Sequence, residues 1–222
     1  YSNFASVIYN KSINKHDNPT ERFVGKTAIL GLGYGMGAEK FQATVKAAGI
    51  TMDLDEAQRV VQTYRTTYPG ISSFWKRATN LLEQTADPLC FVNKYACLEI
   101  QDSRIVLPNG MSLWYPNLEI CGDDHFYTVG NKRQSTWGGR ITENIVQALS
   151  RIVITDAMLR IDHQLTDLKV VLTVHDEIIA LGPQKDAQRN LNDLINAMCI
   201  PPKWSHGLRL DAEGGFDVCY SK

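Results

Sequence analysis

The pattern of hydrophobic residues changes near residue 88, and this change constrains the fold more than any other feature. Residues 1–88 carry apolar side chains at helical spacing, separated by turn-forming residues. Beyond this point short apolar and β-branched runs alternate with turns, and Asn109-Gly110 is typical of a β-hairpin. Longer helical patterns return over Ile141–Leu165 and Lys185–Met198. The sequence therefore predicts an α+β fold, with a helical region at 1–88 and an antiparallel-sheet region at 89–222.

The charge balance does not by itself indicate a nucleic-acid partner. The 222 residues carry a net charge of -1, so no positive field surrounds the whole molecule. The two parts of the chain nevertheless differ in the sign of their charge. Residues 1–99 hold eleven basic and nine acidic side chains, whereas residues 100–222 hold twelve basic and fifteen acidic ones. We expect the helical region to bind anions and the later region to bind cations.

The cysteines, the length of the apolar runs and the start of the sequence indicate the cellular compartment of the protein. Five cysteines without a Cys-x-x-Cys pair suit reduced thiols better than a disulfide framework or a zinc site. No apolar run reaches the length of about 18 residues that a membrane span needs. The chain starts at Tyr1 with neither Met nor a signal-peptide pattern. We expect a cytoplasmic protein without a membrane partner, and a sequence cut from a longer chain.

A four-residue rhythm runs through the second predicted helix. Arg22, Lys26, Leu30 and Tyr34 would form one slowly rotating stripe of two cations, an apolar side chain and an aromatic ring. The cations could hold the phosphates of a nucleoside triphosphate, and the other two could contact its sugar and base. An i,i+4 basic pair is also common on an ordinary solvated helix face, so the stripe alone leaves both interpretations open.

The same segment permits a second reading, in which the chain is a dinucleotide-binding oxidoreductase. Thr27–Leu30 would then be a strand, followed by the glycine-rich turn Gly33-x-Gly35-x-x-Ala38 and by Asp53 as the ribose-binding acid. However, two helical patterns follow Asp53 in succession, whereas a doubly wound sheet needs strands alternating with helices. The local context therefore disfavours this reading.

Two adjacent carboxylates stand at the turn of a predicted apolar hairpin. Asp176 and Glu177 follow His175 between two strongly apolar runs, which indicates a hairpin buried in a sheet. Neighbouring desolvated carboxylates need a cation, and a hard divalent ion such as Mg²⁺ or Mn²⁺ suits oxygen ligands best. An exposed Asp-Glu turn with no function is the alternative.

The two patterns together resemble the family A (DNA polymerase I type) DNA polymerases, and the ending Pro202-Lys-Trp204…Ala212-Glu-Gly is similar to their bacteriophage members. The segment from Arg22 to Gly35 resembles the fingers-helix motif, and Val174-His-Asp-Glu-Ile178 resembles the third palm motif. Between them, Arg140-x3-Asn144 followed by Gln147 resembles the palm helix that contacts the minor groove of the primer-template duplex. The resemblance covers essentially the whole chain and implies a helical fingers subdomain and an antiparallel-sheet palm subdomain.

The resemblance implies template-directed DNA synthesis by two-metal nucleotidyl transfer, with primer-template DNA and dNTPs as partners. Asp176 and Glu177 would bear two Mg²⁺ (or Mn²⁺) ions, and Lys26 would be the third catalytic residue, as a general acid. The residues implied to bind the incoming nucleotide are Arg22, Lys26, Leu30, Tyr34 and Tyr1. The residues implied to contact DNA are Arg140, Asn144, Gln147 and His175.

Three departures from the family pattern qualify what the resemblance implies. Leu30 stands where most members carry Phe or Tyr, and the spacing from Asn144 to Gln147 is one residue short. The first palm motif, with its metal-binding aspartate, is not found in the sequence. We therefore expect a fingers and partial-palm fragment without thumb, inactive alone, whose missing upstream portion is a partner. A non-catalytic duplex-binding module stays open as a further alternative.

Overall fold

The computed structural model describes residues 1–86 and 93–220, which form two compact units. Of these residues, 1–86, 100–105 and 114–144 belong to the first unit, and 93–99, 106–113 and 145–220 belong to the second. Helices and antiparallel strands both occur, which confirms the predicted α+β class. No described helix is long and apolar enough to cross a membrane. The assignment of 1–88 to fingers and 89–222 to palm stays a prediction.

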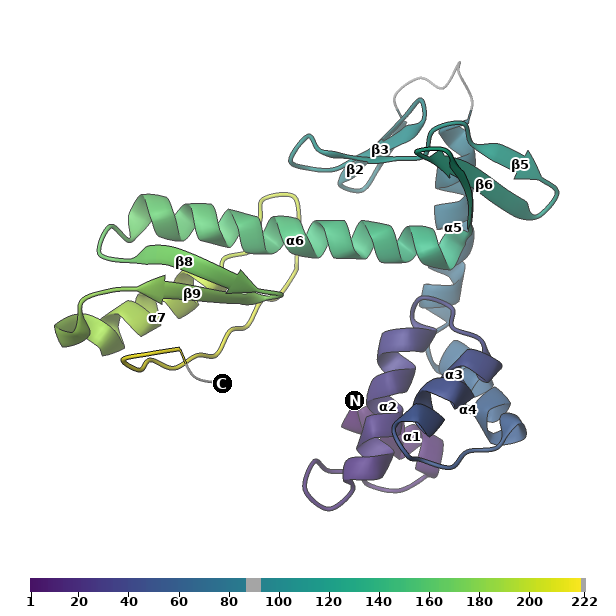
Figure 1. Cartoon of the computed structure of the whole chain (residues 1–222), viewed down its shortest axis with the longest axis horizontal. Helices are drawn as coiled ribbons and strands as arrows, with labels where there is room; N and C mark the ends of the chain where they lie inside the picture. The colour runs from purple at the N-terminus through teal and green to yellow at the C-terminus, as the bar shows by residue number, and fades with distance from the viewer. Residues whose placement is uncertain (87–92, 221–222) are drawn as a thin grey trace. The chain divides into compact units, whose positions relative to one another are not determined.

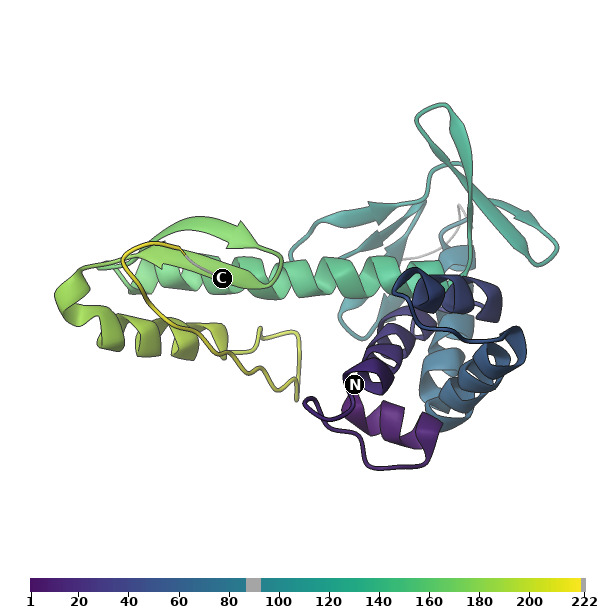
Figure 2. The same ribbon diagram turned by 60° about the horizontal axis from the view of Figure 1, so that its bottom comes forward.

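Five helices precede the first strand, and four of them form a cluster in the first unit (Figures 1 and 2). They are α1 (Ser2–Tyr9), α2 (Pro19–Leu32), α3 (Ala38–Ala47), α4 (Leu54–Thr67) and α5 (Pro69–Gln84). The core of this cluster consists of apolar side chains from α1 to α4 and the segment between α3 and α4: Phe4, Val24, Ala28, Leu32, Phe41, Val45, Met52, Ala57, Val60, Val61 and Tyr64. Burial of these stripes provides most of the stability of such short helices.

The predicted helix boundaries have identifiable chemical causes. Asp53-Leu-Asp-Glu56 has the residue spacing of a helix N-cap, and the Asp53 side chain accepts a hydrogen bond of 2.7 Å from the backbone amide of Glu56 at the start of α4. Gly49 follows α3 with a φ of 80°, a left-handed conformation that glycine adopts without steric cost. Pro19 and Pro69 stand in the first turns of α2 and α5, where a missing amide hydrogen does no harm.

Helices α1 and α2 approach each other so closely that only glycine fits at position 25. A Cβ atom at Gly25 would lie 2.7 Å from the carbonyl oxygen of Tyr1 and 2.8 Å from the Cβ atom of Ala5. Both obstacles belong to backbone or to a side chain without flexibility, so the two helices would have to separate. Gly25 is therefore a packing residue that sets the position of α1 against α2.

Replacing Gly25 with alanine is expected to lower the free energy of unfolding by about 1–3 kcal/mol, the usual cost of overpacking a core. Urea unfolding of the purified chain, followed by circular dichroism, measures the change. Gly70→Ala is the matched control, because a Cβ there has open space in the first turn of α5. Equal midpoints for the two variants would show that α1 does not pack on α2 in this way.

The strands form three separate sheets. In the first, the order is β1 (Asn93–Tyr95), β2 (Leu98–Gln101), β3 (Arg104–Val106) and β4 (Ser112–Trp114). The second sheet is an antiparallel meander of β5 (Glu119–Cys121), β6 (Asp124–Val129) and β7 (Lys132–Thr136). The predicted turn at Asn109-Gly110 lies between β3 and β4, where Gly110 has a φ of 83° and donates to the carbonyl of Leu107 at 2.9 Å.

The third sheet is the hairpin that carries the two predicted metal-binding carboxylates. It pairs β8 (Lys169–Val174) with β9 (Glu177–Leu181), between helix α6 (Gly138–Gln164) and helix α7 (Ala187–Met198) in chain order. A single turn of 3-10 helix, η1 (Gln184–Asp186), precedes α7, so this α-helix begins two residues later than predicted. Helix α6 begins three residues earlier than predicted and includes Gly138 and Gly139.

The hairpin is covered on one face by the helices of the second unit (Figure 1). Buried residues of α6, the hairpin and α7 form this core: Ala157, Ile161, Leu168, Ile178 and Ala197. On the strand β8, however, Val171 is 47% exposed and Leu172 is 50% exposed. The prediction of a hairpin buried in a sheet is wrong for the described residues, because β8 and β9 form a two-stranded sheet of their own and these two apolar side chains are exposed. A β-bulge between Val170 and Leu172 accompanies this exposure.

Candidate functional site

Helix α2 presents two cations and an apolar side chain on its exposed side. Lys26 is exposed, Arg22 is half-buried, and Leu30 is 50% exposed, while Val24 and Ala28 point into the core. Among the residues that the structure describes, no carboxylate lies within ion-pair distance of Arg22 or Lys26. Two cations without carboxylate partners on one helix face can bind the phosphates of an anionic ligand.

The first residue of the chain lies beside this face. The guanidinium carbon of Arg22 is 5.7 Å from the centre of the Tyr1 ring, which is a cation–π contact. The carbonyl of Tyr1 accepts a hydrogen bond of 3.0 Å from the amide of Ala5, so the backbone of Tyr1 is joined to the start of α1. Two of the predicted nucleotide-binding residues are thus in contact with each other.

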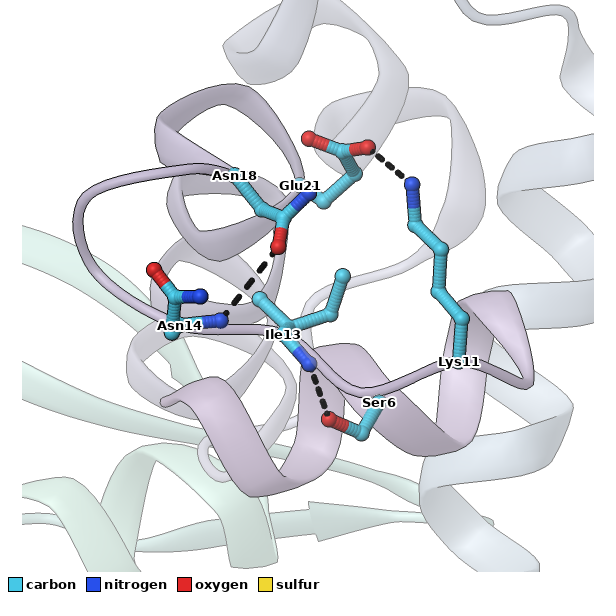
Figure 3. Close-up of polar contacts among 6 residues, drawn as sticks. All are labelled: Ser6, Lys11, Ile13, Asn14, Asn18 and Glu21. Carbon is cyan, nitrogen blue, oxygen red and sulfur yellow. Dashed lines mark hydrogen bonds and ion pairs between the residues drawn. The ribbon is translucent and has the colours of Figure 1, made fainter.

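Side-chain hydrogen bonds hold the loop that leads into α2 (Figure 3). The Ser6 hydroxyl accepts from the amide of Ile13 at 3.0 Å, and Lys11 pairs with Glu21 at 2.5 Å. The amide of Asn14 donates to the Asn18 side chain at 3.4 Å. These contacts join the loop to both helices, and they fix the first turn of α2, from which Arg22 projects.

Tyr34 does not lie on the helical stripe that the sequence predicts. Helix α2 ends at Leu32, and Tyr34 occupies the following turn, where its amide donates to the carbonyl of Gly31 at 3.2 Å. The reason is that Gly35, with a φ of 81°, reverses the chain immediately afterwards. The segment Thr27–Leu30 lies inside a helix, and this excludes the dinucleotide-binding alternative, which needs a strand there.

Tyr34 lies close to the beginning of helix α6. Burial, and then the negative charge of Glu143, raise the pKa of the Tyr34 hydroxyl. The adjacent residues Arg140 and Asn144 are the predicted DNA contacts of this helix. The end of α2, the predicted nucleotide-binding helix, and the start of the predicted minor-groove helix are therefore neighbours within the first unit.

Two residues that the sequence analysis missed orient Arg140 and Asn144. The exposed Arg140 donates to the backbone carbonyl of Ser135 at 2.8 Å. The Asn144 amide donates to the hydroxyl of Tyr115 at 3.0 Å. Tyr115 is 1% exposed, and burial raises the pKa of its hydroxyl to about 12, although the hydrogen bond to Asn144 acts in the opposite direction. No local pattern predicts the contact between Asn144 and Tyr115, because these two residues are far apart in the sequence.

The raised pKa of Tyr115 makes stability fall with pH in the alkaline range. Below pH 10.0, the usual pKa of tyrosine, the hydroxyl is protonated in the folded and unfolded states alike. Between there and about 12 the unfolded state loses the proton first, so the free energy of unfolding decreases as pH rises. We expect wild type to lose about 1 kcal/mol more than Tyr115→Phe between about pH 9 and about pH 11.

Urea unfolding of both proteins at the two pH values measures this difference. Other tyrosines with raised pKa values, Tyr34 and Tyr64 among them, ionise in both proteins, so their effect cancels in the comparison. An equal loss in the two proteins would contradict the burial of the Tyr115 hydroxyl.

The turn between β8 and β9 carries the other group of predicted residues. Val174 pairs with Glu177 at the end of the hairpin, so His175 and Asp176 form a two-residue turn. His175 has a φ of 55°, a conformation uncommon outside glycine. Asp176 is exposed at the tip, and the hydroxyl of Tyr220 donates to the Glu177 carboxylate at 3.3 Å. Tyr220 is a contact that the sequence analysis did not predict.

The chemistry of this turn fits a hard divalent cation only in part. Asp176 and Glu177 offer carboxylate oxygens, the ligand type that Mg²⁺ and Mn²⁺ prefer. Among the described residues, however, no group of three or more carboxylate, imidazole or thiol side chains could enclose an ion. The two carboxylates can therefore contribute to a metal site, and further ligands are needed to complete it.

The predicted site residues are divided between the two units. Those of the first unit are Tyr1, Arg22, Lys26, Leu30, Tyr34, Arg140 and Asn144, and those of the second are Gln147, His175, Asp176 and Glu177. Gln147 is exposed and lies three residues beyond Asn144 in the same helix. The roles of all eleven residues stay predictions.

Comparison with known proteins identifies the family to which this arrangement belongs. The family model described as DNA polymerase family A matches residues 1–216. The chain is 31% identical to a DNA polymerase of Bacillus phage SP02 over 225 aligned residues, which cover 89% of the chain. It also resembles the structure of the POL domain of Pol1 from M. smegmatis in complex with DNA primer-template and dNTP, with a TM-score of 0.63 at 16% identity over 89% of the chain.

The chain belongs to the family A DNA polymerases, as the match over nearly its whole length demonstrates. It spans about a third of the proteins that it matches, since the aligned part is 32% of the phage polymerase and 30% of the mycobacterial chain. Members of this family generally use divalent metal ions.

Proposed function

We propose that this chain is part of a DNA-directed DNA polymerase, which adds deoxynucleotides to a primer 3′ end as a template directs. The observation that carries this proposal is the exposed face of α2, where Arg22 and Lys26 lack carboxylate partners among the described residues and Tyr1 contacts Arg22. Family membership supports it, and the mycobacterial relative was solved with primer-template and dNTP. The similarity to a phage DNA polymerase supports action in the cytoplasm of a bacterial host.

In this proposal the helix α2 binds the incoming nucleotide. Arg22 offers a planar fork and Lys26 a point charge to the triphosphate, where negative charge grows as the pyrophosphate departs. Lys26 also donates a proton to the departing pyrophosphate as a general acid. Leu30 contacts the sugar, Tyr34 packs beside the base pair being formed, and Tyr1 lies near the phosphates.

The carboxylates of the hairpin would hold the divalent metal. Asp176 would be one of the residues that hold the Mg²⁺ or Mn²⁺ ions of the reaction, and Glu177 would assist beside the primer terminus. When bound, the ions supply charge stabilisation and activate the attacking 3′ oxygen. Since Asp176 and Glu177 make an incomplete ligand set, we propose that the remaining ligand comes from a part of the polymerase outside these 222 residues.

The remaining predicted residues would hold the DNA duplex. Arg140, Asn144 and Gln147 would donate hydrogen bonds to minor-groove acceptors, which are nearly the same for every base pair. His175 would lie along the primer backbone. A polymerase needs contacts of this kind, because it must bind every sequence that it copies.

Primer extension tests the proposal directly. The full-length protein should extend a labelled primer by the nucleotides that the template specifies, in Mg²⁺ or Mn²⁺, and chelation should stop the reaction. The 222-residue chain, assayed beside it, should not extend the primer at a comparable rate. If the full-length protein binds primer-template equally with and without metal and never extends it, the non-catalytic duplex-binding module is the correct interpretation.

A further inference from the structure

Two tryptophans enclose the turn that follows helix α2. The indole Nε1 of Trp75, on α5, donates a hydrogen bond of 2.9 Å to the carbonyl oxygen of Gly33. The rings of Trp75 and Trp137 meet edge to face, with their centres 6.2 Å apart and their planes at 74°. Trp137 immediately precedes helix α6. The turn is thus held by side chains from two other elements of the first unit.

Gly35 and Gly139 allow the Trp137 ring to pack against the turn, because a side chain at either position would overlap the ring. A Cβ atom on Gly35 would lie 1.9 Å from the Trp137 ring, and one on Gly139 would lie 2.1 Å from the same ring. The same Cβ atom on Gly139 would lie 2.6 Å from the carbonyl oxygen of Tyr34. The backbone on either side of Trp137 therefore packs directly on its ring.

The helices α5 and α6 are joined just as closely at their crossing. A Cβ atom on Gly138 would lie 2.0 Å from the carbonyl oxygen of Trp75 and 2.7 Å from the hydroxyl of Thr79. Trp75 therefore contacts the turn after α2 through its side chain and the beginning of α6 through its backbone. Tyr34, between these contacts, cannot move relative to α6 unless they change.

We propose that Trp75 and Trp137 are positioning residues that hold Tyr34 beside the first turn of α6, and that they thereby set how strictly the polymerase rejects a mispaired nucleotide. This inference rests on the proposed function, in which Tyr34 packs against the base pair being formed. The tryptophans themselves need not touch the nucleotide. Their effect on selectivity passes through the position of Tyr34.

The sharpest test removes the hydrogen bond and keeps the ring. In the full-length polymerase, Trp75→Phe preserves the aromatic packing but leaves the carbonyl of Gly33 without its indole donor. Loss of one such bond is expected to lower the ratio of kcat/KM for correct over mispaired nucleotides by about fivefold. The matched control is Trp114→Phe, because Trp114 is 57% exposed on β4 and its ring contacts only Arg104 among the interactions described.

A double mutant separates a positioning effect from a general loss of stability. If Trp75 acts through Tyr34, then Trp75→Phe should lower selectivity no further once Tyr34→Ala is present, because residues that act as a unit are not additive. Hydrogen exchange should also be faster at the amides of residues 34–36 in Trp75→Phe than in wild type or Trp114→Phe.

These experiments distinguish failure of the selectivity role of Trp75 from failure of the proposed polymerase function. Unchanged selectivity in Trp75→Phe would overturn the inference, and so would a full additional loss of selectivity when Trp75→Phe is combined with Tyr34→Ala. In either case, primer extension by the wild-type enzyme would still uphold the polymerase function. If wild type extends no primer, the proposed function fails and the selectivity role fails with it. Hydrogen exchange would still decide whether Trp75 holds the turn, since that measurement needs no activity.

Discussion

Replacing Asp176 with alanine in the full-length polymerase is expected to reduce primer extension by about a thousandfold or more, because metal-ion catalysis supplies several kcal/mol of transition-state stabilisation. Asp176 lies exposed at the turn of the β8–β9 hairpin, and its carboxylate forms no ion pair with the residues that the structure describes. The variant should therefore fold normally and bind primer-template with unchanged affinity. Single-turnover extension and a fluorescence-anisotropy titration measure the two properties separately.

The control for Asp176 is another exposed carboxylate of the second unit. Asp162, on α6, lies outside the hairpin, and Asp162→Ala should extend primers at the wild-type rate. Normal extension by Asp176→Ala would remove this residue from the metal site. Loss of DNA binding together with loss of extension would instead assign Asp176 to the DNA interface.

Replacing Lys26 with alanine is expected to slow the chemical step by about a hundredfold, the usual contribution of a general acid. The loss should appear mainly in the maximum rate, because Arg22 remains to bind the triphosphate. Rapid-quench measurement over a range of dNTP concentrations separates the rate from nucleotide affinity. Lys40→Ala, on the exposed side of α3, is the control and should leave both values unchanged.

Lys26→Arg distinguishes the two roles that a lysine can play there. Arginine keeps the positive charge but does not release its proton near neutral pH. If Lys26 is a proton donor, the arginine variant should be nearly as slow as the alanine variant. Recovery of the wild-type rate would show that only the charge is needed, and the general-acid role would be wrong.

Much of the fold can be predicted from local sequence patterns, because the features that they predict depend on contacts between residues close together in the sequence. The side chain of Asp53 caps α4, Gly110 turns between β3 and β4, and the apolar face of α2 points into the core. Each depends on residues within a few positions of one another, for which backbone geometry and hydrophobic spacing are sufficient guides. The placement of Arg22 and Lys26 on one face of α2 follows from the same spacing.

Other features depend on residues that are distant in sequence. The exposure of Val171 and Leu172 could not be predicted from the apolar runs, because a run indicates hydrophobicity but not which element covers it. The position of Tyr34 depends on Gly35, which reverses the chain, and on α6, which begins about a hundred residues later. The hydrogen bond from Asn144 to Tyr115 is likewise long-range.

The sequence by itself determined the class of fold, the family resemblance and the chemical types in the candidate site, since these depend on residue identity and on short spacing. Only the tertiary structure decided how those residues are held: Tyr1 against Arg22, Tyr34 beside the start of α6, and the turn after α2 between two tryptophans. The physical reason is that close packing and long-range hydrogen bonds depend on which distant segments meet, and no periodicity within one segment records that.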